Sequence, residues 1–102
     1  MLPETTDEQR AAALERAAEA RRLRAEIKHL LKSGSLTFDD VLERADENDL
    51  VAGTKVQAII VSMPGMGKIA TKRLMEDIGI AENRTLRGLG PNQKAQLIER
   101  FS

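Results

Sequence analysis

The chain has no cysteine, tryptophan or tyrosine, and two phenylalanines are the only aromatic residues among its 102 residues. The absence of cysteine excludes disulfides and thiolate metal sites, and it is typical of proteins of the reducing cytoplasm. The scarcity of aromatic side chains favours helices over sheets. No apolar run approaches the roughly 20 residues that a membrane span needs, and the first residues are charged where a signal peptide would be apolar. We therefore expect a soluble, cytoplasmic, helical protein.

Groups suited to catalysis or metal binding are also scarce. His29 is the only histidine, and no cysteine or second histidine accompanies it to form a metal site or a nucleophile pair. Lys68 follows Gly67 but is not followed by Ser or Thr, so the phosphate-binding P-loop motif is absent. Gly65, Gly67 and Ala70 match the dinucleotide pattern but lack a strand-helix-strand unit around them. We expect no enzyme, and no cofactor, metal or small-molecule substrate.

The net charge of zero conceals a polarised charge distribution. Residues 1–32 carry seven basic and six acidic residues, residues 33–54 carry one and six, and residues 55–102 carry eight and four. The local field, rather than the total charge, determines where a polyanion binds. The last segment is therefore the predicted surface for a phosphate backbone.

Capping signals predict the starts of two helices. Thr6 precedes Gln9, and Thr37 precedes Asp40, with the spacing of a capping box. The first helix is expected over residues 7–32 and would be roughly 39 Å long. A helix of that length exceeds what so small a domain can cover, so part of it is expected to project as an arm.

The remaining chain is predicted to form three more helices. Residues 54–62 suit either a strand or a helix, but Thr54 and Gln57 have capping-box spacing and no second strand is available. A helix over residues 68–78 should end at Gly79, and Gly90-Pro91 should open the last helix. Its expected apolar stripe consists of Ala95, Ile98 and Phe101. We thus predict an all-α fold, with an N-terminal helical arm over 1–34 and a small helical domain over 35–102.

A glycine-containing turn at residues 64–68 is the first candidate binding element. The backbone N–H groups there should be free donors at a helix N-terminus that carries partial positive charge: those of Met66, Gly67, Lys68 and Ile69. Lys68 adds a full charge, and Lys72 and Arg73 follow one turn later. This pattern suits a phosphate group, although a tight helix-helix turn with ordinary surface lysines remains the alternative.

A second basic turn covers residues 83–90. Arg84 and Arg87 offer forked donors, and Gly88 and Gly90 are expected to expose N–H groups to a phosphate. Together the two turns would form a bipartite phosphate clamp, and the lack of aromatic stacking platforms favours double-stranded DNA over single strands. The full set of candidate DNA-binding residues is Gly65, Met66, Gly67, Lys68, Lys72, Arg73, Arg84, Thr85, Arg87, Gly88, Gly90, Asn92, Gln93 and Lys94.

The predicted arm carries a basic stripe on one side. At about 100° per residue, five cationic side chains fall along one line: Arg10, Arg21, Arg24, Lys28 and Lys32. The stripe is either a solvated charged face or a second contact surface for nucleic acid.

Several strings of residues, in order along nearly the whole chain, make the sequence similar to the actinobacterial integration host factors. These strings span residues 6–15, 55–56, 64–68, 75–80 and 86–90. The resemblance implies a long N-terminal helix followed by a helix-two-turn-helix domain. It further implies a nucleoid-associated protein that binds duplex DNA with little sequence preference, affects DNA bending, supercoiling and compaction, and serves as a host factor in phage integration.

The resemblance also implies specific DNA-facing positions. They are the backbone at Gly65, Gly67, Lys68, Gly88 and Gly90 and the side chains of Lys72, Arg84, Arg87, Asn92 and Gln93. The family often has a second arginine where this chain has Thr85, so one charge is lost at that position. The implied partners are double-stranded DNA and a phage integrase nucleoprotein complex, and the chain is expected to act as a monomer.

Two other functions stay open at this point. Helix-two-turn-helix elements also bind ribosomal RNA, which makes an RNA-binding protein the first alternative. The second is a protein-interaction module, in which the acidic segment 39–49 or the apolar side of the long helix is the working surface.

Overall fold

The computed structural model describes residues 6–102, which form six α-helices and one 3-10 helix. Their bounds are α1 Asp7–Lys32, α2 Phe38–Glu47, α3 Asp49–Ala52, α4 Val56–Val61, α5 Lys68–Ile78, η1 Leu86–Gly88 and α6 Pro91–Phe101. Within this range there is no strand, only an isolated antiparallel bridge between Lys55 and Thr85. The predicted all-α fold is confirmed.

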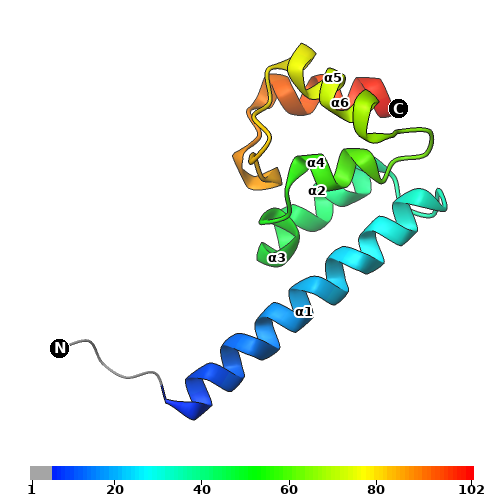
Figure 1. The fold of residues 1–102 in the computed structure, drawn as a ribbon. Coiled ribbons are helices and arrows are strands. Elements are labelled where there is room, and N and C mark those ends of the chain that lie inside the picture. The colour runs from blue at the N-terminus through cyan, green and yellow to red at the C-terminus, as the bar shows by residue number, and fades with distance from the viewer. Residues whose placement is uncertain (1–5) are drawn as a thin grey trace.

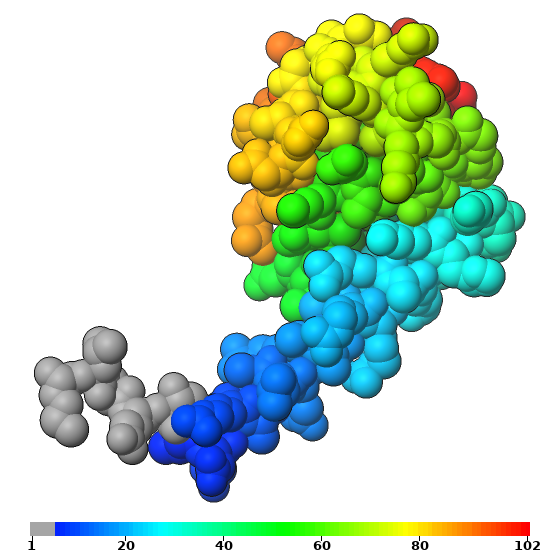
Figure 2. Space-filling model, in the orientation of Figure 1, coloured from blue at the N-terminus to red at the C-terminus, as the bar shows by residue number. Residues whose placement is uncertain are grey.

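Helix α1 extends well beyond the other helices (Figure 1). Its capping box forms as predicted, since the Thr6 hydroxyl accepts from the Gln9 N–H at 3.1 Å and the Gln9 side chain accepts from the Thr6 N–H at 3.0 Å. Gly34 follows the helix end with a φ of 78°, a conformation that favours glycine. The first half of α1 stands clear of the rounded body formed by later residues (Figure 2).

The last turns of α1 nevertheless belong to the core. Ile27 and Leu31 are completely buried, and α1 packs there against α3 and α4. The predicted division after residue 34 stays a prediction, and residues 1–5 of the arm lie outside the described range. The helical body around this core includes buried side chains from every helix: Ile27, Leu31, Phe38, Val41, Val51, Val56, Ile59, Ile60, Met75, Leu86 and Leu97.

Helix α2 starts at the second predicted capping box. The Thr37 hydroxyl accepts from the Asp40 N–H at 3.1 Å, and the Asp40 carboxylate accepts from the Thr37 N–H at 3.0 Å. These hydrogen bonds, first of all the one from the Thr37 backbone, lower the pKa of Asp40 below its usual value. Leu36 and Val41 are both buried, as a hydrophobic staple requires.

Two local expectations were wrong. Thr54 does not cap α4; its side chain is 2% exposed, and its hydroxyl donates to the Leu50 carbonyl at 3.1 Å, so Lys55 takes the cap position without a side-chain hydrogen bond. In α6, Ile98 and Phe101 pack against the core as predicted, but Ala95 is exposed and the completely buried residue is Leu97. The five predicted helices form where expected, whereas α3 and η1 were not predicted.

None of the helices in residues 6–102 combines the length and hydropathy that a membrane crossing requires.

Thr37→Ala should lower the free energy of unfolding by about 1 kcal/mol, because it removes the N-cap of a helix that packs in the core. The same change at Thr6, which caps the projecting end of α1, should leave the main unfolding transition nearly unchanged. Urea denaturation followed by circular dichroism measures both. The pKa of Asp40 is lower in the folded protein than in the unfolded chain, so its hydrogen bonds stabilise the fold above the unfolded-state pKa and this stability is lost as pH falls. The effect of Thr37→Ala should therefore shrink in acid. Equal effects of the two substitutions would contradict the conclusion that α2 belongs to the core and that the start of α1 does not.

Candidate nucleic-acid interface

The turn between α4 and α5 is fixed by hydrogen bonds within the protein. The Met66 N–H donates to the Met63 carbonyl at 3.1 Å, and the buried Thr71 hydroxyl donates to the Gly67 carbonyl at 2.8 Å. Gly65 has a φ of 78°, so the turn itself requires glycine at that position. The prediction of a free N–H at Met66 is therefore wrong, because this donor closes the turn.

The start of α5 leaves its backbone donors free. No acceptor within residues 6–102 reaches the N–H groups of Lys68 and Ile69, and Gly67 at the cap position has no side chain to supply one. Gly67 has an ordinary φ of −106°, and a Cβ placed on it would meet no atom within 4 Å. The fold therefore does not require glycine at position 67, and the partial positive charge of the helix start is open to an external anion.

Helices with a capping side chain lie in the N-terminal part of the chain, and helices without one lie in the C-terminal part. Side chains hydrogen bond to the first turns of the three N-terminal helices, from Thr6, Thr37 and Asn48. The three α-helices of the basic segment 55–102 start without an N-cap side chain that accepts from the helix, at Lys55, Gly67 and Gly90. The start of α5, with its free donors, thus lies in the segment that carries eight basic residues and four acidic ones.

The glycines of the second turn do not have the predicted free donors. The Gly88 N–H donates to the Thr85 carbonyl at 3.0 Å within η1, and the Gly90 N–H donates to the Gln93 side chain at 3.0 Å. The expectation failed because the chain closes a 3-10 turn here and α6 supplies a side-chain acceptor. Leu86 and Leu89 are buried and anchor the turn in the core.

Gly88 has a different role, which is to accommodate Arg84. The Arg84 guanidinium donates to the Gly88 carbonyl at 3.0 Å, and a Cβ on residue 88 would lie only 2.9 Å from the Arg84 Cδ. Contact this close would force the arginine to shift. Glycine at position 88 therefore fixes the path of an exposed cationic side chain across the turn.

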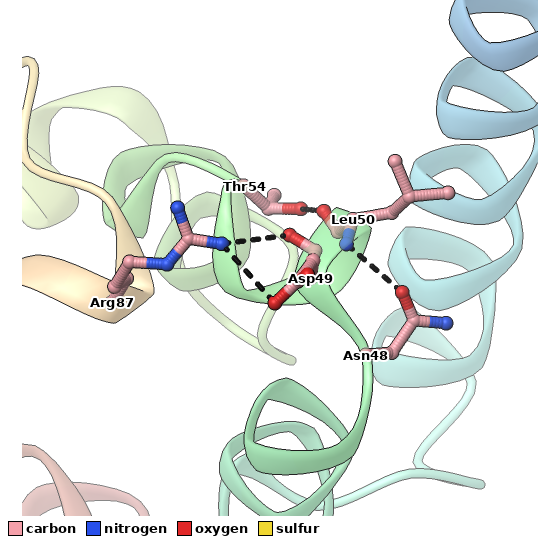
Figure 3. A network of polar contacts seen from close by, with 5 residues as sticks. All are labelled: Asn48, Asp49, Leu50, Thr54 and Arg87. Atoms are coloured by element: carbon pink, nitrogen blue, oxygen red, sulfur yellow. Dashed lines mark hydrogen bonds and ion pairs between the residues drawn. The ribbon is translucent and has the colours of Figure 1, made fainter.

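Arg87 reaches across to the start of α3 (Figure 3). Its Nη2 lies 3.4 Å from the Asp49 carbonyl oxygen and 3.5 Å from an Asp49 carboxylate oxygen. The Arg87 side chain is 62% exposed and that of Asp49 is fully exposed. A solvent-exposed ion pair of this kind contributes little to the stability of the fold. Asn48 caps the same helix by accepting from the Leu50 N–H at 2.9 Å. A phosphate can therefore compete for Arg87 at small cost.

Gln93 is occupied inside the protein, unlike its neighbour Asn92. Its amide oxygen accepts from Gly90, and its amide nitrogen donates to the Gly79 carbonyl at 3.1 Å, which joins the end of α5 to the start of α6. The exposed Asn92 side chain has no hydrogen bond within residues 6–102, and Lys94 is half-buried beside Asp46, Asp49 and Arg87. A role for any of them in DNA binding stays a prediction.

A groove of about 620 Å³ runs between α4 and α5 and adds residues that the sequence did not single out. Lys68 and Lys72 line it together with Lys55, whose bridge to Thr85 brings the second turn to the groove wall. Glu76 and Glu82 also line it, so the groove is not uniformly basic. The two turns lie before and after α5 (Figure 1). In the sequence Lys55 belongs to one of the strings that carry the family resemblance, but it is not among the predicted binding residues.

The five cations of the arm stripe are all exposed, and no ion pair occupies them within the described residues. Their role as a second contact surface stays a prediction. His29 is exposed as well, and residues 6–102 contain no cluster of His, Asp or Glu that could hold a metal ion.

The helices and the two turns agree with a helix-two-turn-helix domain, and residues 31–101 match the family model described as an S13-like H2TH domain. The chain is 50% identical to the integration host factor of Streptomyces coelicolor, over 98% of this chain and 94% of that protein. It is 46% identical to the integration host factor of Mycobacterium tuberculosis, over 98% and 95% of the two chains. The chain belongs to the actinobacterial integration host factor family.

A solved structure supports the same relationship. It is described as "Structure of sIHF bound to an 8bp palindromic DNA" and superposes with a TM-score of 0.83 at 45% identity. The match covers 86% of this chain and 99% of that one. The predicted helix-two-turn-helix fold and the family resemblance are confirmed.

Gln93→Ala should lower the free energy of unfolding by about 1–2 kcal/mol, because it removes the hydrogen bond from Gly90 at the start of α6 and the one to Gly79 that joins α6 to the end of α5. Asn92→Ala is the matched control, since the neighbouring side chain is exposed and makes no hydrogen bond to the described residues. Urea unfolding of both variants measures the difference. An equal loss in the two would show that Gln93 is not the residue that joins the helices.

Proposed function

We propose that this protein is a non-enzymatic, nucleoid-associated DNA architectural protein of the cytoplasm. As a monomer it binds duplex DNA through backbone phosphates with little sequence preference, and it bends or compacts the DNA. These effects on topology make it a host factor in site-specific phage integration, as a component of an integrase nucleoprotein complex. The proposal agrees with the names of the relatives and with the DNA-bound structure of a family member.

The observation that carries the proposal is the uncapped start of α5. Gly67 is not required by the fold, the donors of Lys68 and Ile69 are free, and Lys68 and Lys72 lie beside them. A phosphate oxygen satisfies such donors and gains from both the helix dipole and the lysine charges. Contacts of this kind position the duplex but carry no base information.

The second turn supplies further phosphate contacts in this proposal. Arg84 is held over Gly88, and Arg87 exchanges its exposed Asp49 partner for a phosphate. Lys55 extends the surface along the groove to Lys68. The arm stripe is a third contact in the proposal when the duplex is long enough to reach it. The proposed duplex contacts are therefore mainly cationic side chains and helix-start N–H groups.

Gly67→Ser should move stability and DNA affinity in opposite directions. A serine hydroxyl at the cap accepts the free N–H groups of α5, which raises the free energy of unfolding by a few tenths of a kcal/mol. The same hydroxyl occupies the place of the phosphate oxygen and should weaken duplex binding. Urea unfolding and a fluorescence anisotropy titration on one preparation measure both quantities. Unchanged affinity in a stabilised variant would contradict phosphate binding at this helix start.

The salt response of binding should reveal the number of phosphate contacts. With about six cationic contacts, affinity for a mixed-sequence duplex should fall about a thousandfold between roughly 50 and 200 mM salt. Arg87→Ala should reduce the salt slope by about one and weaken binding to unrelated duplexes equally. Arg44→Ala is the control, because this exposed arginine lies on the acidic helix α2.

Three outcomes would contradict the proposed binding of duplex DNA through its phosphates. A flat salt response would exclude phosphate contacts as the main source of affinity. A loss confined to one sequence in Arg87→Ala would show that Arg87 reads bases. Tighter binding to an RNA duplex of the same sequence would favour the RNA-binding alternative.

A further inference from the structure

Ile69 is an exposed apolar side chain inside a polar, basic surface. Only two large apolar side chains in residues 6–102 are strongly exposed: Leu14 at 69% and Ile69 at 74%. Leu14 lies on the projecting arm, whereas Ile69 is the second residue of α5, directly after Lys68. Single exposed apolar residues are common, so the position of Ile69, not its exposure alone, carries the argument.

The fold gains nothing from an isoleucine at this position. Helix α5 packs through Thr71, Met75 and the half-buried Leu74 and Ile78, and at about 100° per residue Ile69 points away from that side. Isoleucine also has no particular preference for a first helical turn. The residue is therefore explained by neither packing nor helix formation.

The direction of the side chain places it at the proposed interface. Side chains on an α-helix lean toward the N-terminus, so Ile69 leans toward the turn over residues 64–67. The free N–H groups of α5 point the same way. A duplex whose phosphate occupies that helix start has Ile69 at the edge of one of its grooves.

We infer that Ile69 is a wedge that enters a groove of the duplex, where its apolar surface contacts sugars and base edges and opens the base stack. The inference rests on the proposed function and deepens it, because it couples phosphate binding to DNA bending. Apolar wedges of this kind unstack base steps and kink the duplex in other architectural proteins. In this chain no exposed aromatic residue is available for the same task, since Phe38 is buried and Phe101 is half-buried against it.

The surroundings of Ile69 favour a polyanion over a protein partner. Lys68, Lys72 and Arg73 flank it and are all exposed, and no second large apolar side chain of α5 is strongly exposed. Protein interfaces usually offer a contiguous apolar patch of several hundred Å². A single apolar side chain within a ring of cations fits a groove between two rows of phosphates.

The test compares Ile69→Ala with Leu14→Ala, its equally exposed counterpart on the arm. Affinity is measured on an intact duplex and on the same duplex with a short single-strand gap at its centre, and bending is measured by energy transfer between the duplex ends. Ile69→Ala should bind the intact duplex about tenfold more weakly and bend it less. On the gapped duplex the loss should nearly vanish, because a flexible site removes the cost of bending. Its salt slope should equal that of the wild type, since no charge is lost.

The controls separate a wedge from an ordinary contact. Both duplexes are kept too short to reach the arm stripe, so Leu14→Ala should match the wild type on both, and Ile69→Met should retain most of the bend. An Ile69→Ala variant that bends and binds as the wild type does would overturn the inference. So would an equal loss on intact and gapped duplexes, or an equal loss in Leu14→Ala. If the wild type binds neither duplex, the proposed function fails as well; if it binds both and only the wedge signature is missing, the proposed function stands.

Discussion

Two backbone hydrogen bonds between residues 54–56 and 84–86 hold the proposed interface together. The Val56 N–H donates to the Arg84 carbonyl at 2.9 Å, and the Leu86 N–H donates to the Thr54 carbonyl at 3.0 Å. This short pairing attaches the connection between α5 and α6 to the start of α4 and satisfies backbone groups of both segments. It places the second turn next to Lys55, which lines the groove between α4 and α5, and buried Leu86 makes the attachment part of the core. The position of the second turn on the protein depends on this pairing.

The parts of the fold that could be predicted from the sequence are those that depend on local signals. The capping boxes at Thr6 and Thr37, the left-handed Gly79 with a φ of 85° and Pro91 at the first position of α6 all involve residues within one helical turn. The local signals gave a wrong prediction where tertiary packing overrides them. Thr54 has the spacing of a cap, but its hydroxyl is buried and bonded to α3, so the same local pattern has another role. The groove between α4 and α5 joins residues distant in the sequence, which no local pattern reveals.

The candidate site shows why four glycines with similar neighbours cannot be assigned one role from sequence. Gly65 satisfies a backbone conformation, Gly88 makes room for Arg84, and Gly90 donates its N–H to Gln93. Only Gly67 combines ordinary dihedrals, open space and a helix start without an acceptor. Whether a backbone donor is free depends on acceptors that the fold brings from elsewhere. The family resemblance predicts that these turns face DNA, and the structure distinguishes which of their backbone donors remain free.

The charge distribution gives the proposed complex a direction. Segment 33–54 carries one basic and six acidic residues, and its exposed Asp49 forms an ion pair with Arg87 of the basic turn. A duplex that approached over α2 would meet the carboxylates, whereas one that approaches over the start of α5 meets free N–H groups and lysines. Coulomb forces between exposed charges fade over about 8–10 Å at physiological salt, so the acidic side repels without cancelling the attraction at the basic side. Zero net charge is therefore compatible with polyanion binding, and it restricts that binding to one side of the molecule.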